Sequence, residues 1–191
     1  MVLVDAGADD PLRLTGNGQV VRASELVRGR PIPPVRTTGP LSVSEIPPGA
    51  LRAMRAGLEP AAATANDPPR DKLPSDAQRM RTWALGQLGH VAATVNPVEI
   101  EELAWLRAER AKQPTPLGDR PLVVLTRGMP EETGPDAPAQ EAEHRRDHEK
   151  IAGLSRQGRL VVATKSRHHV QLDEPALVVQ AIREVVTATR P

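Results

Sequence analysis

A segment near the C-terminus constrains the fold most, because an apolar run at residues 160–163 is followed by a polar turn and a helical pattern. Such a short apolar run favours a buried strand. The turn carries His168 and His169, and we expect Asp173 to cap a helix that has Pro175 in its first turn. Open α/β sheets hold their reactive groups just beyond the C-terminal ends of the strands. The segment therefore predicts an α/β fold with an imidazole at that end of the sheet.

Two further runs have the composition of buried strands. Residues 122–126 read Leu-Val-Val-Leu-Thr, and residues 1–4 form an apolar run that ends at Asp5. Because helical patterns join these runs, right-handed crossovers would make all three strands parallel. The predicted fold class is therefore α/β with three parallel strands. A Gly-Asn-Gly turn lies at 16–18, and residues 19–28 fit either one short helix or a strand followed by a helix.

Helical patterns fill most of the region between the first two strands. Apolar residues three and four apart predict a helix over 48–58, and a Ser75-x-x-Gln78 capping box opens a second helix that ends near residue 88. Met80 and Trp83 are assigned to the apolar face of this second helix. A third helix is predicted from Asn96-Pro97 to about residue 112.

Two helices are predicted in the last third of the chain. The first, over about 139–156, is charged and ends at Gly158 in the C′ position. His144 and His148 lie one turn apart on it and are interpreted as part of a solvated face. The second helix spans 174–189, and its apolar stripe consists of Leu177, Val178, Ala181, Ile182 and Val185.

Composition excludes several classes of protein. The chain has no Phe, Tyr or Cys and only 2 Trp, so its core must be aliphatic and it can form neither disulfides nor thiolate metal sites. A net charge of +1, without basic runs, gives no reason to expect nucleic acid as a partner. No apolar run approaches the roughly 20 residues of a membrane span. A cytoplasmic protein is expected.

The strand, the His-His turn and the Leu172-Asp173-x-Pro175 element resemble the end of the α/β-hydrolase fold. In that family the catalytic histidine follows the last strand. By the same resemblance residues 121–128 look like the seventh strand and residues 1–5 like the sixth. The resemblance implies a partial α/β-hydrolase fold: the sixth-strand region at 1–28, a helical lid at 29–113, and the C-terminal core at 114–191.

The resemblance also implies roles for individual residues. His168 would be the general base, with His169 as a packing neighbour. Its carboxylate partner would be Asp5, at the end of the sixth strand, or Glu131, after the seventh. Asp5 is favoured, since Pro130 stands beside Glu131 and Glu132 and Asp136 are less well spaced. Family members usually have glycine before the histidine, so Arg167 is expected to strain the turn if the turn needs a positive φ.

The nucleophile that the family would supply is missing from the sequence. No Gly-x-Ser-x-Gly occurs, and none of the six serines (24, 42, 44, 75, 155 and 166) follows a strand and precedes a helix. The His168-His169 pair is an unsuitable metal half-site, because zinc requires three or four ligands and no matching His or Cys is nearby in the sequence. No cofactor and no metal are predicted.

Three interpretations remain open. The chain could be the C-terminal portion of an α/β-hydrolase that acts on an ester-like or epoxide-like small molecule, inactive without its nucleophile half. It could be a non-catalytic binding protein derived from that fold, with the lid helices as its surface. It could also be a separate chain completed by a partner. The expected partners are therefore a small-molecule substrate, the missing N-terminal half, or a second copy bound through an exposed sheet edge.

Overall fold

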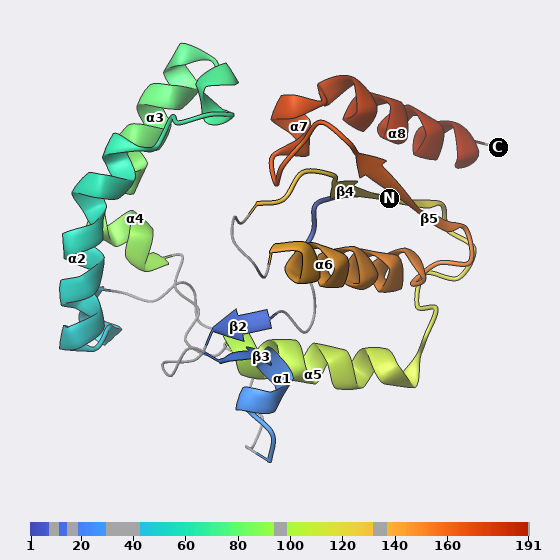
Figure 1. Cartoon of the computed structure of the whole chain (residues 1–191), viewed down its shortest axis with the longest axis horizontal. Coiled ribbons are helices and arrows are strands. Elements are labelled where there is room, and N and C mark those ends of the chain that lie inside the picture. The colour runs from blue at the N-terminus through green and yellow to red at the C-terminus, as the bar shows by residue number, and fades with distance from the viewer. Residues whose placement is uncertain (8–11, 15–18, 30–42, 94–98, 132–136, 191) are drawn as a thin grey trace. The chain divides into compact units, whose positions relative to one another are not determined.

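The computed structural model describes residues 1–7, 12–14, 19–29, 43–93, 99–131 and 137–190 (Figure 1). The chain divides into two compact units, one of Met1–Pro31 together with Ile100–Pro191 and one of Ile32–Glu99. The second unit falls within the segment assigned to the lid; its role as a lid stays a prediction. None of the helices in the described ranges has both the length and the apolarity needed to cross a membrane.

Three parallel strands form the main sheet of the first unit, which confirms the α/β class. They are β1 (Val2–Val4), β4 (Leu122–Arg127) and β5 (Gly158–Ala163), in the order β1-β4-β5. Val2 lies opposite Val123, and Leu122 lies opposite Gly158. In the described part of the chain β1 pairs with β4 alone, so its other side is an open edge. Pairing of two copies through this edge stays a prediction.

Alternate side chains of β4 enter two separate cores, because successive residues of a strand point to opposite faces. Leu125 packs on the side of α8 (Pro175–Ala188), and Val124 packs on the side of α6 (Ala137–Ala152). Figure 1 shows the sheet between these two helices. Both cores are aliphatic, as the composition requires. This packing fixes the strand ends, and therefore the residues that follow them.

Several helix ends differ from the sequence predictions. α6 ends at Ala152, and Gly158 is the first residue of β5 rather than a C′ residue. The short helix α7 (Val170–Asp173) precedes α8, and the N-cap of α8 is Glu174 instead of Asp173. The predicted stripe of α8 is correct except for Ile182, which is exposed.

Residues 19–28 form a strand followed by a helix, the second of the two alternatives. β3 (Val20–Arg22) runs into α1 (Ala23–Leu26) and pairs in antiparallel fashion with β2 (Leu12–Leu14), a strand that the sequence did not predict. Arg22 forms ion pairs with Glu143 and Asp147 of α6, the latter at 3.2 Å. These ion pairs attach the β2–β3 hairpin to α6.

One more helix of the first unit, α5 (Glu99–Lys112), lies near α1. Its Arg107 donates a hydrogen bond of 2.7 Å to Ser24 of α1. The third predicted helix is therefore present over residues 99–112, whereas its predicted start at Asn96-Pro97 lies outside the described residues.

The second unit consists of η1 (Val43–Glu45), α2 (Pro48–Ala63), η2 (Arg70–Lys72), α3 (Ser75–Leu85) and α4 (Leu88–Ala93). The predicted capping box is wrong: α3 starts after Pro74 without a side-chain cap, and Gln78 instead donates to the carbonyls of Asp71 and Leu73. The predicted apolar face is also wrong, since Met80 and Trp83 are 70% and 66% exposed.

Candidate functional site

Asp5 lies directly after β1, at the C-terminal end of the sheet. Its amide N–H donates to the carbonyl of Leu125 at 2.8 Å, which extends the β1–β4 ladder by one residue. Its φ is 41°, in the left-handed region that Asp tolerates better than most residues. This turn of the backbone ends the strand, and the Asp5 side chain is completely buried.

Four donors surround the carboxylate of Asp5, two on each oxygen. Oδ1 accepts from the backbone N–H of Arg127 at 3.1 Å and from Nε2 of His144 at 2.8 Å. Oδ2 accepts from Nδ1 of His168 at 2.8 Å and from the guanidinium of Arg127 at 3.3 Å. Because an ionised carboxylate only accepts hydrogen bonds, Nε2 of His144 and Nδ1 of His168 each carry a proton. The charged form of the carboxylate is therefore fully hydrogen-bonded.

These contacts decide the protonation state of Asp5. Burial by itself would raise its pKa, since the charged form loses its hydration. The hydrogen bonds from His144, His168 and Arg127 outweigh burial and hold the pKa well below the usual range of an aspartate. Asp5 is thus a permanent anion at the edge of the sheet at neutral pH.

His168 stands at the rim of this cluster on the turn after β5. Its Nδ1 faces Asp5, and 53% of its side chain is exposed. The two nitrogens of an imidazole form hydrogen bonds separately. In the Nδ1–H tautomer, Nε2 therefore has a lone pair that can accept a proton from another group. The condition for strain at Arg167 is not met: among the described non-glycine residues a positive φ occurs at Asp5 and not at Arg167.

Glu131, the alternative acid, contacts the backbone of His168 instead of its ring. Its carboxylate accepts from the His168 N–H at 3.2 Å. The structure thus brings Asp5, Glu131 and His168 together, but Asp5 alone of the two acids contacts the imidazole. Glu132 and Asp136 lie outside the described residues. Whether either acid takes part in catalysis stays a prediction.

The turn that carries His168 is held by contacts that sequence reasoning missed. The carboxylate of Glu174 accepts from the Lys165 N–H at 2.8 Å and from the Ser166 hydroxyl at 3.1 Å. The N–H of Gly128 donates to the carbonyls of Ala163 and Ser166. A Cβ at Gly128 would stand 2.7 Å from Cα of Thr164, so only glycine permits this approach. The turn is fixed to β4 and to the start of α8.

Removal of the Glu174 carboxylate is expected to loosen this turn. Glu174→Ala should lower the free energy of unfolding by about 1–3 kcal/mol, because the buried Ser166 hydroxyl and the Lys165 N–H lose their acceptor. Hydrogen exchange at Lys165 should become faster. Glu149→Ala on the exposed side of α6 is the matched control and should leave both quantities unchanged. Equal exchange at Lys165 in the two variants would contradict this role.

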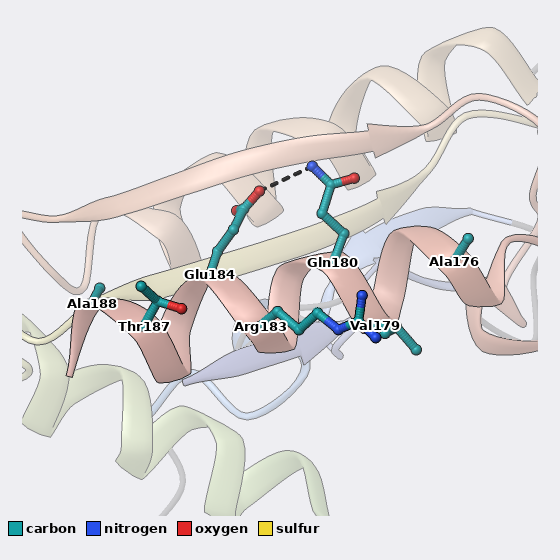
Figure 2. A pocket seen from close by; sticks show the side chains of 7 residues that line it. All are labelled: Ala176, Val179, Gln180, Arg183, Glu184, Thr187 and Ala188. Atoms are coloured by element: carbon teal, nitrogen blue, oxygen red, sulfur yellow. Dashed lines mark hydrogen bonds between the residues drawn. The ribbon is translucent and has the colours of Figure 1, made fainter. Parts of the chain in front are cut away.

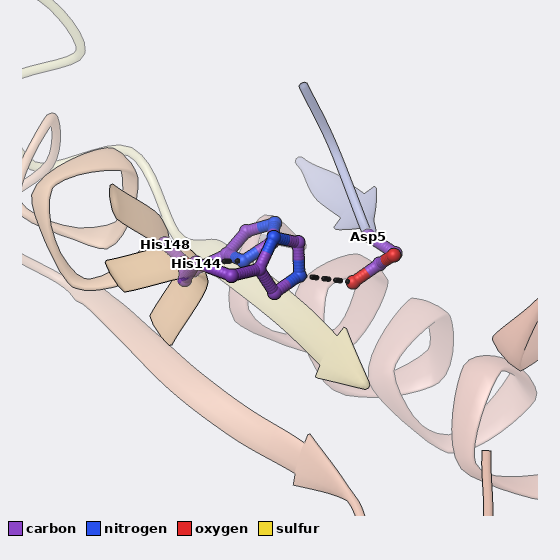
Figure 3. Close-up of side chains that lie close together, drawn as sticks. All are labelled: Asp5, His144 and His148. Atoms are coloured by element: carbon purple, nitrogen blue, oxygen red, sulfur yellow. Dashed lines mark hydrogen bonds and ion pairs between the residues drawn. The ribbon is translucent and has the colours of Figure 1, made fainter. Parts of the chain in front are cut away.

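His144 and His148 do not lie on a solvated face, which corrects the interpretation of α6. His148 is buried, and its ring lies edge-on to that of His144 at a centroid distance of 4.2 Å. Figure 3 shows both rings of α6 beside Asp5, with His144 on its carboxylate. The i, i+4 spacing places both on one face. Sequence alone could have shown this face but not the acid across from it.

The side chains of Asp5, His144 and His148 could in principle hold a metal ion, because one ligand atom of each lies within 4.8 Å of the others. Their hydrogen bonds do not fit that role. Nε2 of His148 is 2.9 Å from the Ala6 carbonyl, and Nδ1 is 3.0 Å from the Thr126 hydroxyl. Asp5 is also bound to a cationic guanidinium. A metal would have to displace several of these bonds, so the arrangement is that of a hydrogen-bonded network.

Arg127 links this network to α6. Its guanidinium bonds both oxygens of Glu141, with Nη2 to Oε1 at 3.0 Å, while Nη1 reaches Asp5. Burial would raise the pKa of Glu141, but these bonds lower it on balance. Arg127 therefore bridges two carboxylates but offsets the charge of only one, so Asp5, Glu141 and Arg127 together keep one negative charge when the imidazoles are neutral.

The titration of His148 and Asp5 predicts how stability depends on pH. Burial lowers the pKa of His148, so the unfolded chain takes up a proton first, below about pH 6.5, and stability falls with pH from there. The lowered pKa of Asp5 adds a second loss below about pH 4. Urea midpoints measured from pH 7.5 to 3 should show both declines. His148→Gln should remove the first one, and a midpoint that is constant from pH 7.5 to 5 would contradict the assignment.

His169 and two serines have structural positions. His169 is the N-cap of α7, and its ring lies 5.0 Å from that of His168. Ser155 donates to the Gly118 carbonyl, and Ser166 donates to Glu174. Neither hydroxyl is bonded to an imidazole, in agreement with their exclusion as nucleophiles on sequence grounds.

A shallow hollow lies elsewhere in the first unit, along α8 (Figure 2). Gln180 donates to Glu184 across one part of it, at 3.0 Å. Its lining is Ala176, Val179, Gln180, Arg183, Glu184, Thr187 and Ala188. None of these residues belongs to the cluster around Asp5, so this hollow is not a substrate pocket for His168.

No family model, curated protein or solved structure matches the chain. A buried carboxylate that fixes the Nδ1–H tautomer of a half-exposed histidine can support that histidine as a proton acceptor at Nε2, since it stabilises the imidazolium that forms.

Proposed function

We propose that Asp5 and His168 are the acid and the base of a hydrolytic centre, in a chain that supplies the C-terminal part of an α/β-hydrolase-like catalytic domain. The observation that carries the proposal is the 2.8 Å bond from Nδ1 of His168 to the buried Asp5, beyond the C-terminal ends of parallel strands. Parallel sheets place catalytic groups at this end. The resemblance of the strand, turn and helix around His168 to that family agrees with the proposal.

The proposed reaction is hydrolysis of an ester-like or epoxide-like small molecule. Nε2 of His168 takes the proton of a serine hydroxyl or of a water as its oxygen attacks the electrophilic carbon of the substrate. Asp5 holds the ring and stabilises the imidazolium. The imidazolium then gives the proton to the leaving oxygen as the bond between that oxygen and the attacked carbon breaks. Where serine was the nucleophile, a water that His168 deprotonates hydrolyses the covalent intermediate in the same way and frees the serine. The nucleophile comes from a second segment with a Gly-x-Ser-x-Gly turn, since this sequence has none.

Reconstitution tests the proposal. The chain alone should show no turnover of nitrophenyl acetate above that of its His168→Ala variant. Coexpression with a separate segment that carries the strand, the Gly-x-Ser-x-Gly turn and the following helix should restore hydrolysis. His168→Ala should abolish the restored activity. Restored activity that survives His168→Ala would refute the base, and strong activity of the chain alone would refute the need for a second segment.

The second candidate is a non-catalytic binding protein. Exposure of Met80 and Trp83, one turn apart on α3, favours it, because such an apolar pair is a usual element of an interaction surface. If this candidate is correct, an apolar probe such as anilinonaphthalene sulfonate should bind at α3 and quench the fluorescence of Trp83. In the Trp105→Phe background, Met80→Ser should weaken that binding. Unchanged binding in the Met80→Ser variant would count against it.

A further inference from the structure

Two imidazoles share the carboxylate of Asp5, one on each oxygen. Nε2 of His144 is 2.8 Å from Oδ1, and Nδ1 of His168 is 2.8 Å from Oδ2. The two histidines belong to different elements, α6 and the turn after β5, and are 24 positions apart in the sequence. A histidine that acts as a base needs a carboxylate partner, but it does not need a second imidazole on the same carboxylate. The presence of His144 therefore requires an explanation of its own.

We propose that His144 is a positioning residue of the Asp5–His168 pair. Through the shared carboxylate, the protonation of His144 and the protonation of His168 are coupled. The proposal deepens the proposed function and depends on it for its catalytic meaning. His144 holds Oδ1 in place, so that Oδ2 stays directed at the ring of His168. Because one anion serves both rings, a proton gained by either ring makes a proton on the other less favourable.

The geometry around His144 supports this coupling. Its side chain is 20% exposed, so water can exchange protons with it, while Asp5 is completely buried. His148, whose pKa burial lowers, stays neutral beside it. Among the described residues, the other charged groups bonded to this cluster or to the turn of His168 are Arg127 on β4, Glu141 on α6, Glu131 after β4 and Glu174 before α8.

The coupling has a consequence for catalysis. A proton on His144 would offset the charge of Asp5 and so disfavour a proton on Nε2 of His168, the atom that must be free for base action. Loss of the His144 imidazole should therefore change the pH range in which His168 can act as a base.

Two substitutions at position 144 separate positioning from charge. His144→Gln keeps an N–H donor that can reach Oδ1 but cannot be protonated. His144→Ala removes both the donor and the charge. His90→Gln, at an exposed position of α4 in the second unit, is the control for loss of a histidine elsewhere. All can be studied in the full chain by NMR of the ring nitrogens, without any substrate.

In the wild-type chain the titration of His168 should extend over a wider pH range than that of a single site. In His144→Gln it should have single-site shape, with a midpoint that differs from that of the wild type. The Nδ1–H tautomer of His168 should persist in this variant and decrease in His144→Ala. His90→Gln should match the wild type.

Superimposable His168 titrations and equal tautomer populations in the wild type and both His144 variants would overturn the proposal. If one of the two His144 variants unfolds, its NMR spectrum loses chemical-shift dispersion. The other variant then tests the proposal. Failure of the proposed function is a separate result: the rings could be coupled through Asp5 while the reconstituted protein shows no hydrolysis that depends on His168.

Discussion

Asp5→Asn should destabilise the first unit by about 3–5 kcal/mol and disconnect His168 from its acid. An amide at this buried position cannot compensate the guanidinium of Arg127. Its NH₂ group would also face one of the donors that now bind the carboxylate, either an imidazole N–H or the Arg127 N–H. Urea unfolding measures the loss of stability, and ring-nitrogen NMR should show that the Nδ1–H tautomer of His168 is no longer favoured. In a reconstituted hydrolase, turnover should fall on the order of 10⁴-fold.

Asp119→Asn is the matched control for this substitution. Asp119 forms a bidentate ion pair with Arg156 at 2.6 Å, but on the exposed surface. Exposed ion pairs are screened by solvent and contribute little. The control should therefore unfold at the wild-type urea concentration and leave the His168 spectrum unchanged. Similar losses in the two variants would show that burial of Asp5 is not the source of the effect.

Gly158→Ala should have a comparable effect on stability, for a steric reason. A Cβ on Gly158 would overlap the carbonyl oxygen of Ala152 and stand 2.8 Å from its carbonyl carbon and 3.0 Å from the carbonyl oxygen of Ser155. All three are backbone atoms at the end of α6 and in the turn into β5, so no side-chain rotation relieves the contact. We expect a loss of about 3 kcal/mol, measured by urea unfolding.

Gly7→Ala is the control for this change. A Cβ on Gly7 meets nothing within 4 Å, so the alanine should cost no stability. Because Gly158 starts the strand that leads to His168, the Gly158→Ala variant should also change the His168 ring shifts. Wild-type stability of Gly158→Ala would mean that the turn between α6 and β5 can open without cost.

The strands and their direction could be predicted because their signal is local. The apolar runs at 122–126 and 160–163 lie within β4 and β5, and α6 between them connects the two as parallel neighbours. Helix faces were predicted less well. Met80 and Trp83 have helical spacing, yet the spacing of apolar residues does not show whether another element covers them. The exact caps also failed: Gln78 bonds to loop carbonyls instead of closing a capping box, and the N-cap of α8 is Glu174 instead of Asp173.

The residues around His168 divide in the same way. Asp5 and Glu131 were found from their positions after strands, and both lie beside His168. His144 and Arg127 were missed, since their partner Asp5 is 139 and 122 residues away in the sequence. Glu174 was missed because no sequence pattern shows that the turn after β5 brings Lys165 and Ser166 to its carboxylate. The charged residues of α6 predicted a helix face exposed to solvent, whereas its two histidines face the sheet.

The sequence by itself determined that this chain forms three parallel strands with an aliphatic core and places a histidine beyond the last strand, because periodicity, strand composition and turn residues act over a few positions. Only the tertiary structure decided which acid meets that histidine. The β1-β4-β5 order brings Asp5 next to a turn 163 residues later, and α6 packs a second imidazole onto the same carboxylate. Such contacts depend on how the strands and helices pack, which no local pattern in the chain contains.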